Sequence, residues 1–460
     1  MFIQKNKPML YTKKFLLLSL LSIVIAITAT AQTSDIFKKI PPNLLRQDFL
    51  LMRDTLQKVH AGLYRYKSKA EMDRVFDSCF ATINDSMPVT DFYALTSYVI
   101  AAVEDGHSNC KLPGGLMKDY MANVNVFPAM VMFIHNRAFV FCCKQNDDLT
   151  GGEILSVNNH PMNEIVQRLF KYIASDGSIQ SRKNWEMPEF FQVLFNILYG
   201  TQTSFNVRYK TKAGETKTTT LQADLLKNIF CTNPFPRPSR YLNLRYTHNA
   251  IAVLTLKSFF DGFLEQTGEN FRQFLDSAFK DINGKHIKKI LIDVRSNQGG
   301  NDGNGEILYS YLTQKPFLYY TSQETVTEKI TESHNSNLGM QQPSANSYTG
   351  KVYVLINGRS FSGVAEFSSI VRSNNRGVFI GEECGGGYYG NTSGNEYMVA
   401  LPNTQIICRV PIIKYTMAVK KAKYKDRGVI PDYPAYHTIN DIIEHKDSQM
   451  DYALKVVGEK

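Results

Sequence analysis

The sequence predicts an α/β protein in which a helical N-terminal segment and a β-rich module precede an α/β core. Three observations lead to this prediction. Before residue 105, apolar residues recur at three-and-four spacing, which is typical of amphipathic helices. Between 124 and 225, short apolar runs are separated by turn residues, which is typical of strands. After residue 240, strand-like runs alternate with helical segments, which indicates crossover units around a mixed sheet.

The first 31 residues are typical of a secretory signal peptide. A start that contains lysines leads into an apolar run from Phe15 to Ile27, and Ala29-Thr30-Ala31 fits the small-x-small cleavage pattern. The uncharged stretch up to Ala31 is shorter than the ~20 residues that span a bilayer, which favours cleavage over a membrane anchor. We therefore expect an exported protein, periplasmic or extracellular, without stable membrane insertion after signal removal.

Composition narrows the function classes. The chain has 460 residues, 43% hydrophobic and 20% charged, which excludes a disordered or collagen-like protein. Four of the 52 basic residues lie in the signal, which leaves 48 against 42 acidic residues and gives no reason to expect nucleic acid. The seven cysteines are scattered and form no C-x-x-C pair, so we expect buried thiols rather than a disulfide framework, with one disulfide left open. The histidines form no H-E-x-x-H pair, so no metal is expected.

The domain organisation follows from the same patterns. We expect an N-terminal helical region over 34–115, with helices at 44–60, 69–84 and 90–104. The β-rich module covers 124–225 and contains one or two helices, and the proline-rich segment 230–240 is a linker. The core covers 226–460, and residues 321–350 are a loop or hairpin insertion. Its predicted strands are 251–256, 288–294, 352–356 and 377–380, and its predicted helices are 268–282, 304–314 and 362–374.

Ser362 is the strongest candidate for chemistry. It lies in N-G-R-S-F-S-G-V-A-E-F, between a buried strand and a helix, where a serine oxygen can project from the carboxyl edge of a sheet. Gly363 beside it allows close approach of a substrate. The alternative is a structural helix cap, because serine is a preferred N-cap and Glu366 follows at roughly capping-box distance. The spacing does not match the G-x-S-x-G elbow of α/β hydrolases.

Two further segments carry candidate groups. In I-L-I-D-V-R-S-N-Q-G-G-N, a strand runs into Gly299 and Gly300, whose backbone amides can face an anion, although a plain strand-to-helix turn explains them as well. His107 lies in the turn E-D-G-H-S after a predicted helix. A lone histidine is more often structural than catalytic, and only the fold can bring it to Ser362.

These segments, in this order, resemble the carboxyl-terminal processing (tail-specific) serine peptidases, in particular their tricorn-core-like branch. The D-x-R-x-N-x-G-G stretch starts at Asp293, the nucleophile segment appears as F-S-G-V-A-E-F, and the D-G-H-T turn appears as D-G-H-S. The G-V-x-P-D signature appears as G-V-I-P-D from Gly428. The segment G-G-E-I-L-S-V-N-N-H-P-M-N-E-I resembles the family's PDZ-like module, which holds peptide ends or gates the active site.

The resemblance also has departures. One branch of the family uses a lysine in the loop after the nucleophile helix, but Gly386, Gly387, Tyr388 and Tyr389 stand here, so the resemblance makes His107 the base. The tricorn branch places a glutamate just before G-V-x-P-D, and Asp426 is the nearest carboxylate in that area. Glu383 is the rival candidate for this third acid.

The resemblance thus implies an exported serine endopeptidase that cleaves polypeptides by acyl-enzyme chemistry. Ser362 is the expected nucleophile, His107 the general base and Asp426 the orienting acid. The backbone amides of Gly363 and of Gly299 or Gly300 form the expected oxyanion hole, and no cofactor is required. Two alternatives stay open: a catalytically inactive peptide-binding protein that retains the fold, and an acyl hydrolase of small substrates such as an esterase. The sequence does not give the oligomeric state.

Overall fold

Three helices form the N-terminal part of the computed structural model, which describes residues 35–458. The predicted signal peptide lies outside the described residues. Helix α1 spans Pro42–Val59, α2 spans Lys69–Ala81 and α3 spans Val89–Ala102, each within a few residues of the predicted helix. The start of α2 is fixed by a capping box, in which the Ser68 side chain accepts the Glu71 N–H and the Glu71 side chain accepts the Ser68 N–H. The paired short strands β1 (Lys39–Ile40) and β2 (Met87–Pro88) precede α1 and α3.

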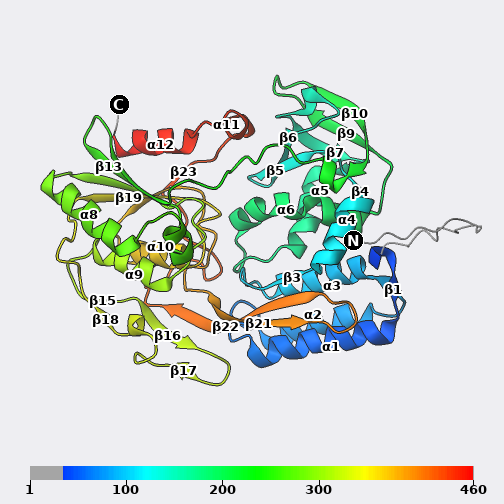
Figure 1. Cartoon of the computed structure of the whole chain (residues 1–460), viewed down its shortest axis with the longest axis horizontal. Coiled ribbons are helices and arrows are strands. Elements are labelled where there is room, and N and C mark those ends of the chain that lie inside the picture. Colours follow the sequence, from blue (N-terminus) through cyan, green and yellow to red (C-terminus); the bar gives the residue numbers. More distant parts are fainter. Residues whose placement is uncertain (1–34, 459–460) are drawn as a thin grey trace, which may run out of the picture. The chain divides into compact units, whose positions relative to one another are not determined.

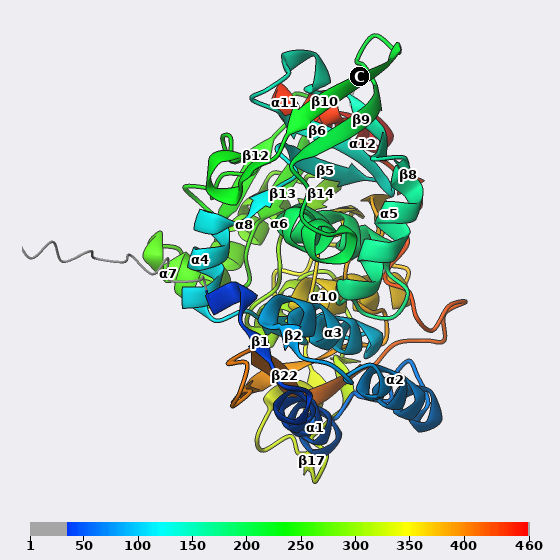
Figure 2. The same cartoon turned by 90° about the vertical axis from the view of Figure 1, so that its right-hand side faces the viewer.

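The β-rich module is an antiparallel sheet with helices packed against it. The strand order is β10-β9-β7-β6-β5, and helix α6 lies against β5 (Figure 2). Phenylalanine and aliphatic side chains from strands and helices share one buried core, which explains why the segment folds around its own centre. The elements are β5 (Met130–Ile134), β6 (Arg137–Cys142), β7 (Glu153–Val157), β8 (His160–Pro161), α5 (Met162–Leu169), α6 (Gln180–Tyr199), β9 (Ser204–Lys210) and β10 (Thr216–Gln222). Short strands β4 (Asn125–Val126) and β11 (Asp224–Leu225) pair at its boundary, next to α4 (Gly114–Asn123).

The core is a mixed sheet, as predicted, with helices on both faces. Its order is β12-β13-β14-β19-β20-β23, in which β12 is antiparallel to β13 and all other neighbours are parallel. Alternate residues of the strands pack against α8, α9 and α10 on one face and against α12 on the other. The strands are β12 (Leu242–Tyr246), β13 (Ile251–Leu256), β14 (Lys289–Asp293), β19 (Lys351–Ile356), β20 (Val378–Gly381) and β23 (Tyr433–Pro434). The helices are α7 (Asp261–Gln266), α8 (Phe271–Gly284), α9 (Asp302–Ser310), α10 (Gly363–Ser373), α11 (Ile439–Ile443) and α12 (Ser448–Val457).

A third sheet joins the two ends of the chain. The hairpin of β21 (Thr392–Ala400) and β22 (Ile407–Met417), to which the sequence analysis assigned no element, lies beside the N-terminal helices (Figure 1). On the other edge of β22, β16 (Tyr320–Glu324) and β3 (Asn109–Lys111) pair with opposite ends of the strand. The predicted insertion 321–350 contains β16, β17 (Lys329–Ile330) and β18 (Met340–Gln341), and β18 pairs with β15 (Phe317–Leu318).

One disulfide is present among the described residues. Cys142 at the end of β6 is bonded to Cys231 in the proline-containing linker, which ties the module to the start of the core. The other five cysteines are buried and unbonded, in line with the expectation of buried thiols. Between residues 35 and 458, no helix combines the length and the apolar character that crossing a bilayer requires.

Candidate active site

Ser362 stands on a strained turn between β19 and α10. The turn is closed by the Ser360 N–H, which donates to the Asn357 carbonyl at 2.8 Å, and by the Ser360 hydroxyl, which donates to the Val294 carbonyl at 2.9 Å. Ser362 itself has φ 56° and ψ −128°, a region that L-residues avoid. Such strain costs on the order of 1–3 kcal/mol, so the packing around the turn must hold it in place.

The Ser362 side chain does not cap the helix. Although Ser362 directly precedes α10, its hydroxyl accepts no backbone N–H of the first turn, which removes the structural alternative from the sequence analysis. Within residues 35–458 the hydroxyl has no hydrogen-bond partner, and Ser362 is half-buried in the wall of a cavity of about 1120 Å³. The oxygen is therefore available to an incoming group.

The glycine loop of the D-x-R-x-N-x-G-G stretch is pressed against this serine. A Cβ atom on Gly299, which has φ 86°, would lie 2.7 Å from the Ser362 Cβ and 2.8 Å from the Gly363 nitrogen. The Gly299 N–H is already engaged, because it donates to the Asn297 side chain at 2.9 Å. By contrast, the amides of Gly300 and Gly363 have no acceptor among the described residues, and both glycines line the cavity.

The charged residues of the same stretch serve a different purpose. Arg295 pairs with Asp293 at 2.9 Å and with Asp447, the cap of helix α12, at 2.6 Å. Burial alone would raise the pKa of Asp293, but the charges of Arg295 and Lys257 outweigh burial and lower it. The D-x-R pair thus anchors the C-terminal helix to the sheet below the glycine loop.

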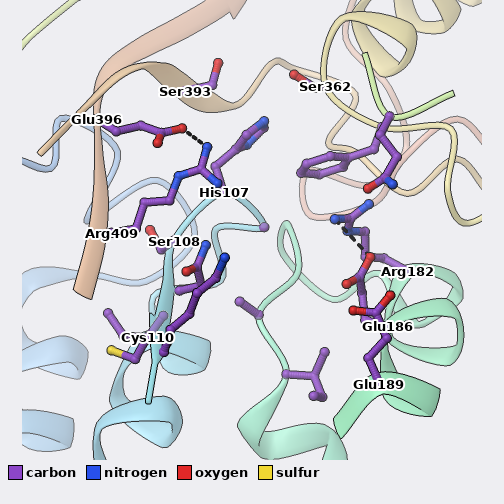
Figure 3. A pocket seen from close by; sticks show the side chains of 18 of the residues that line it. His107, Ser108, Cys110, Arg182, Glu186, Glu189, Ser362, Ser393, Glu396 and Arg409 are labelled. Atoms are coloured by element: carbon purple, nitrogen blue, oxygen red, sulfur yellow. Dashed lines mark ion pairs between the residues drawn. The ribbon is translucent and has the colours of Figure 1, made fainter. Parts of the chain in front are cut away.

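His107 lies in the same cavity wall as Ser362, although 255 positions separate them in the sequence. It stands in the turn between α3 and β3, and its imidazole points toward Ser362 (Figure 3). The ring stacks on Phe361, the neighbour of the nucleophile candidate, at 4.4 Å between centroids, and the Arg182 guanidinium lies 3.7 Å from the same Phe361 ring centre. Among the described residues, no hydrogen bond joins His107 to Ser362.

The carboxylate next to His107 is Asp105, not either of the predicted acids. Asp105 Oδ1 accepts the His107 backbone N–H at 2.9 Å and lies 3.7 Å from His107 Nδ1. Its Oδ2 lies 2.7 Å from Nε2 of the buried His60. Burial alone would raise the pKa of Asp105, but its interactions with His107 and His60 outweigh burial and hold the pKa below the usual range. Asp105 therefore stays ionised beside the imidazole.

A second buried carboxylate, Asp176, ties the histidine turn to the glycine-rich loop after α10. Its Oδ1 accepts the Gly106 N–H at 2.7 Å, and its Oδ2 accepts the Gly387 N–H at 2.9 Å. Burial and the negative charge of Asp105 raise the pKa of Asp176. The ligand atoms of Asp105, His107 and Asp176 lie within 4.8 Å of one another, as a metal site would require. All four carboxylate oxygens already accept hydrogen bonds, which favours orientation of the turn over binding of a cation.

The predicted acids are engaged elsewhere or lie apart. Glu383 pairs with Arg427 at 2.6 Å and accepts the Gly428 N–H. The Asp426 side chain has no hydrogen bond or ion pair among the described residues, and its backbone carbonyl accepts the Ser178 N–H at 2.9 Å. Neither carboxylate lines the cavity that holds Ser362. Asp105 and Asp176 were missed, although Asp105 stands in the very turn that singled out His107; His60 has no distinguishing sequence context.

Glu366, the residue proposed as a capping partner, is buried beneath the nucleophile candidate instead. The Tyr320 hydroxyl and the Asn391 amide each donate to its carboxylate at 2.7 Å. Burial raises the pKa of Glu366 to about 7. Glu366 is therefore a titratable group in the floor of the cavity.

The geometry so far defines a class of protein. A free serine hydroxyl on a strained strand-to-helix turn, two unpaired amides and an imidazole in one cavity are the parts of a serine acyl hydrolase. The particular family follows from comparison. Residues 250–435, which include Ser362, match the model of Peptidase family S41. The match confirms the resemblance to the carboxyl-terminal processing peptidases and the prediction of a serine-type peptidase.

Solved structures of CPAF share the fold of this chain. CPAF in complex with lactacystin is similar with a TM-score of 0.61 and 13% identity, over 90% of this chain and 98% of that one. Mature CPAF gives a TM-score of 0.61 and 13% identity, over 90% and 96%. The photosystem II D1 C-terminal processing protease gives a TM-score of 0.42 and 12% identity, over 85% and 93%. No curated protein sequence matches the chain.

Proposed function

We propose that the chain is an exported serine endopeptidase in which Ser362 is the nucleophile and His107 the general base. One observation carries the proposal: a strained serine with an unbonded hydroxyl shares a cavity with an imidazole delivered by a distant segment. A serine hydroxyl is a weak nucleophile at neutral pH and requires such a base. In the absence of substrate this hydrogen bond is often open and closes only in the substrate complex.

The proposed reaction proceeds in two halves. Ser362 Oγ attacks the peptide carbonyl while His107 takes its proton, and the resulting imidazolium then protonates the leaving amine. Water, deprotonated by His107, hydrolyses the acyl-enzyme and regenerates the serine. The unpaired amides of Gly363 and Gly300 would hold the oxyanion in both halves, and removal of one such donor typically costs about 2.7–4 kcal/mol.

We assign the orienting role to Asp105 instead of Asp426 or Glu383. Asp105 Oδ1 lies 3.7 Å from His107 Nδ1, and the low pKa of Asp105 keeps it ionised when the imidazolium forms. A negative charge beside Nδ1 stabilises the imidazolium and fixes the ring orientation. A rotation that shortens the 3.7 Å separation completes the triad.

We further propose that the module 124–225 presents polypeptide substrates to the site. Its edge strand β5 has one neighbour in the sheet, and strand edges bind extended peptides by backbone hydrogen bonds. Export rests on the signal-peptide pattern of residues 1–31. An unstructured polypeptide in the periplasm or outside the cell is the substrate class that these features favour.

The test compares the wild type with Ser362→Ala and the matched control Ser369→Ala. Ser369 is buried in the same helix and bonds back to the Ala365 carbonyl, so it reports on folding alone. We expect a fluorophosphonate probe to label the wild type and Ser369→Ala but not Ser362→Ala, with hydrolysis of unstructured peptides following the same pattern. Labelling without hydrolysis of any peptide would favour an esterase. Absence of both in the wild type would favour the inactive peptide-binding protein.

A further inference from the structure

We propose that His60 is a positioning residue that holds Asp105 in the orientation required by His107. The proposal rests on the function proposed above and adds a residue that does not touch the substrate. His60 follows helix α1 as its C-cap and lies 47 positions before His107. It reaches the site only because α1 and the histidine turn pack together.

The contacts of His60 are few and specific. Its side chain is 0% exposed, and Nε2 lies 2.7 Å from Asp105 Oδ2 and 3.0 Å from the Ser108 hydroxyl. Nδ1 accepts the Gly62 backbone N–H at 3.1 Å. A buried imidazole with polar partners on both nitrogens is held in one orientation.

These contacts determine which nitrogen of the His60 ring carries the proton. Because Gly62 donates to Nδ1, that nitrogen carries a lone pair, and the proton of the neutral ring resides on Nε2. Nε2–H therefore donates to Asp105 Oδ2. Asp105 Oδ1 is left to face the histidine turn, where it already accepts the His107 N–H.

His60 does not act as a second base. It is absent from the cavity wall, and proton transfer through its ring would place a hydrogen on Nδ1, where the Gly62 N–H already points. Its contribution is a fixed hydrogen bond to a buried carboxylate. Loss of that bond leaves Asp105 Oδ2 with only the longer hydrogen bond from the Ser108 hydroxyl, at 3.4 Å, and so loosens the carboxylate. A displacement of about 1 Å in such a site costs on the order of 100-fold in rate.

The experiment compares His60→Phe, His60→Gln and the control Met52→Ala. Phenylalanine fills the space without a donor, glutamine places an amide N–H near the position of Nε2, and Met52 is a buried residue of the same helix without a polar role. We expect His60→Phe to lower kcat about 10- to 100-fold with KM unchanged, and the rate of fluorophosphonate labelling to fall in parallel. His60→Gln restores most of kcat, and Met52→Ala lowers thermal stability but leaves kcat intact.

A second measurement depends neither on catalysis nor on any substitution of His60. Nitrogen-15 chemical shifts of the imidazole in Ser362→Ala protein report the tautomer of His60, and we expect protonated Nε2 with unprotonated Nδ1. A proton on Nδ1, or equal kcat losses in His60→Phe and His60→Gln at matched stability, would overturn the role of His60. If the wild type lacks peptidase activity while the tautomer is as expected, the proposed function fails and the His60–Asp105 geometry stands.

Discussion

The nucleophile turn and the histidine turn are built by different means. The nucleophile turn, Asn357–Gly363, is closed by bonds within itself and to the neighbouring strand, and its strain is visible in the φ of Ser362. The histidine turn, Asp105–Ser108, contains bonds of its own, from the His107 N–H to the Asp105 carboxylate and from the Ser108 N–H to the Asp105 carbonyl. It is also held in place by side chains from other parts of the chain, namely His60 and Asp176. Only the first of the two turns lies inside the segment that matches the family model.

This difference shows which parts of the sequence determine the structure of each turn. A locally closed turn can be specified by a short motif, because its own residues supply the hydrogen bonds. A turn held from outside depends on contacts that are distant in sequence, and each of them can be altered without changing the motif. The four predictions below test how far the two turns depend on each other.

The largest effect is expected from removal of either reactive side chain. Ser362→Ala and His107→Ala should each lower kcat/KM about 10⁴- to 10⁶-fold, because the two groups act as a unit. The double variant should lose no more than the single ones. Kinetics on an unstructured peptide measure all three. If the two losses multiply, the turns contribute independently and the proposed pair is wrong.

The second prediction concerns the carboxylate that orients His107. Asp105→Asn should lower kcat about 10²- to 10⁴-fold, because an amide at this position no longer stabilises the imidazolium. Asp426→Asn is the matched control and should retain wild-type kinetics, since the Asp426 carboxylate has no partner among the described residues. A larger loss in Asp426→Asn than in Asp105→Asn would return the orienting role to the acid expected from the sequence.

The third prediction tests the packing of the glycine loop against the nucleophile turn. Gly299→Ala introduces a Cβ at 2.7 Å from the Ser362 Cβ and forces a non-glycine residue to φ 86°. We expect about 1–3 kcal/mol of lost stability and on the order of 100-fold lower kcat. Gly284→Ala, at the end of α8 with open space around it, is the control and should be neutral or slightly stabilising. Full activity in Gly299→Ala would show that the glycine loop does not pack on the nucleophile as described.

The fourth prediction concerns the pH dependence of stability. Burial raises the pKa of Glu366 to about 7 from an ordinary value of 4.5, so the folded state binds the proton more tightly than the unfolded state. The stability from this group is fully present below pH 4.5 and is lost as pH rises toward and through 7. The loss amounts to about 3 kcal/mol.

Denaturant titrations at pH 5 and pH 8 measure this change. Glu366→Gln should flatten the decline, whereas Glu328→Gln, an exposed residue, should leave it as in the wild type. Burial raises the pKa of Glu306 to about 7 as well, so part of the decline remains in Glu366→Gln. A decline that is identical in wild type and Glu366→Gln would place the titrating group elsewhere.

The sequence was informative where the relevant contacts are local. Strand 251–256 was predicted to the residue, and the helix after Ser362 to within one, because the apolar pattern of each segment is local and unbroken. The hairpin β21–β22 was missed because a bulge interrupts its register between Ser393 and Glu396 and blurs the alternation. The module was predicted to contain one or two helices, but the 20-residue helix α6 was not located, and Pro188 stands inside it.

The same distinction between local and distant contacts applies to the residues of the site. Ser362, His107 and the glycines were found from short motifs, whereas the acid was placed at Asp426 by analogy of position. Asp105 could have been proposed from its place two residues before His107. Asp176 and His60 could not, because their roles arise only from packing between segments that lie 45 to 211 positions from their partners.

The pairing of β3 with β22 has a consequence for biogenesis. The strand that follows the histidine turn finds its partner at residues 407–409, and in the described fold it has no other. A nascent chain that has been synthesised only as far as helix α10 therefore still lacks residues 407–409, which pair with the strand next to His107. Synthesis of some four hundred residues must therefore precede the pairing that completes the site, so an unfinished chain does not yet hold His107 beside Ser362.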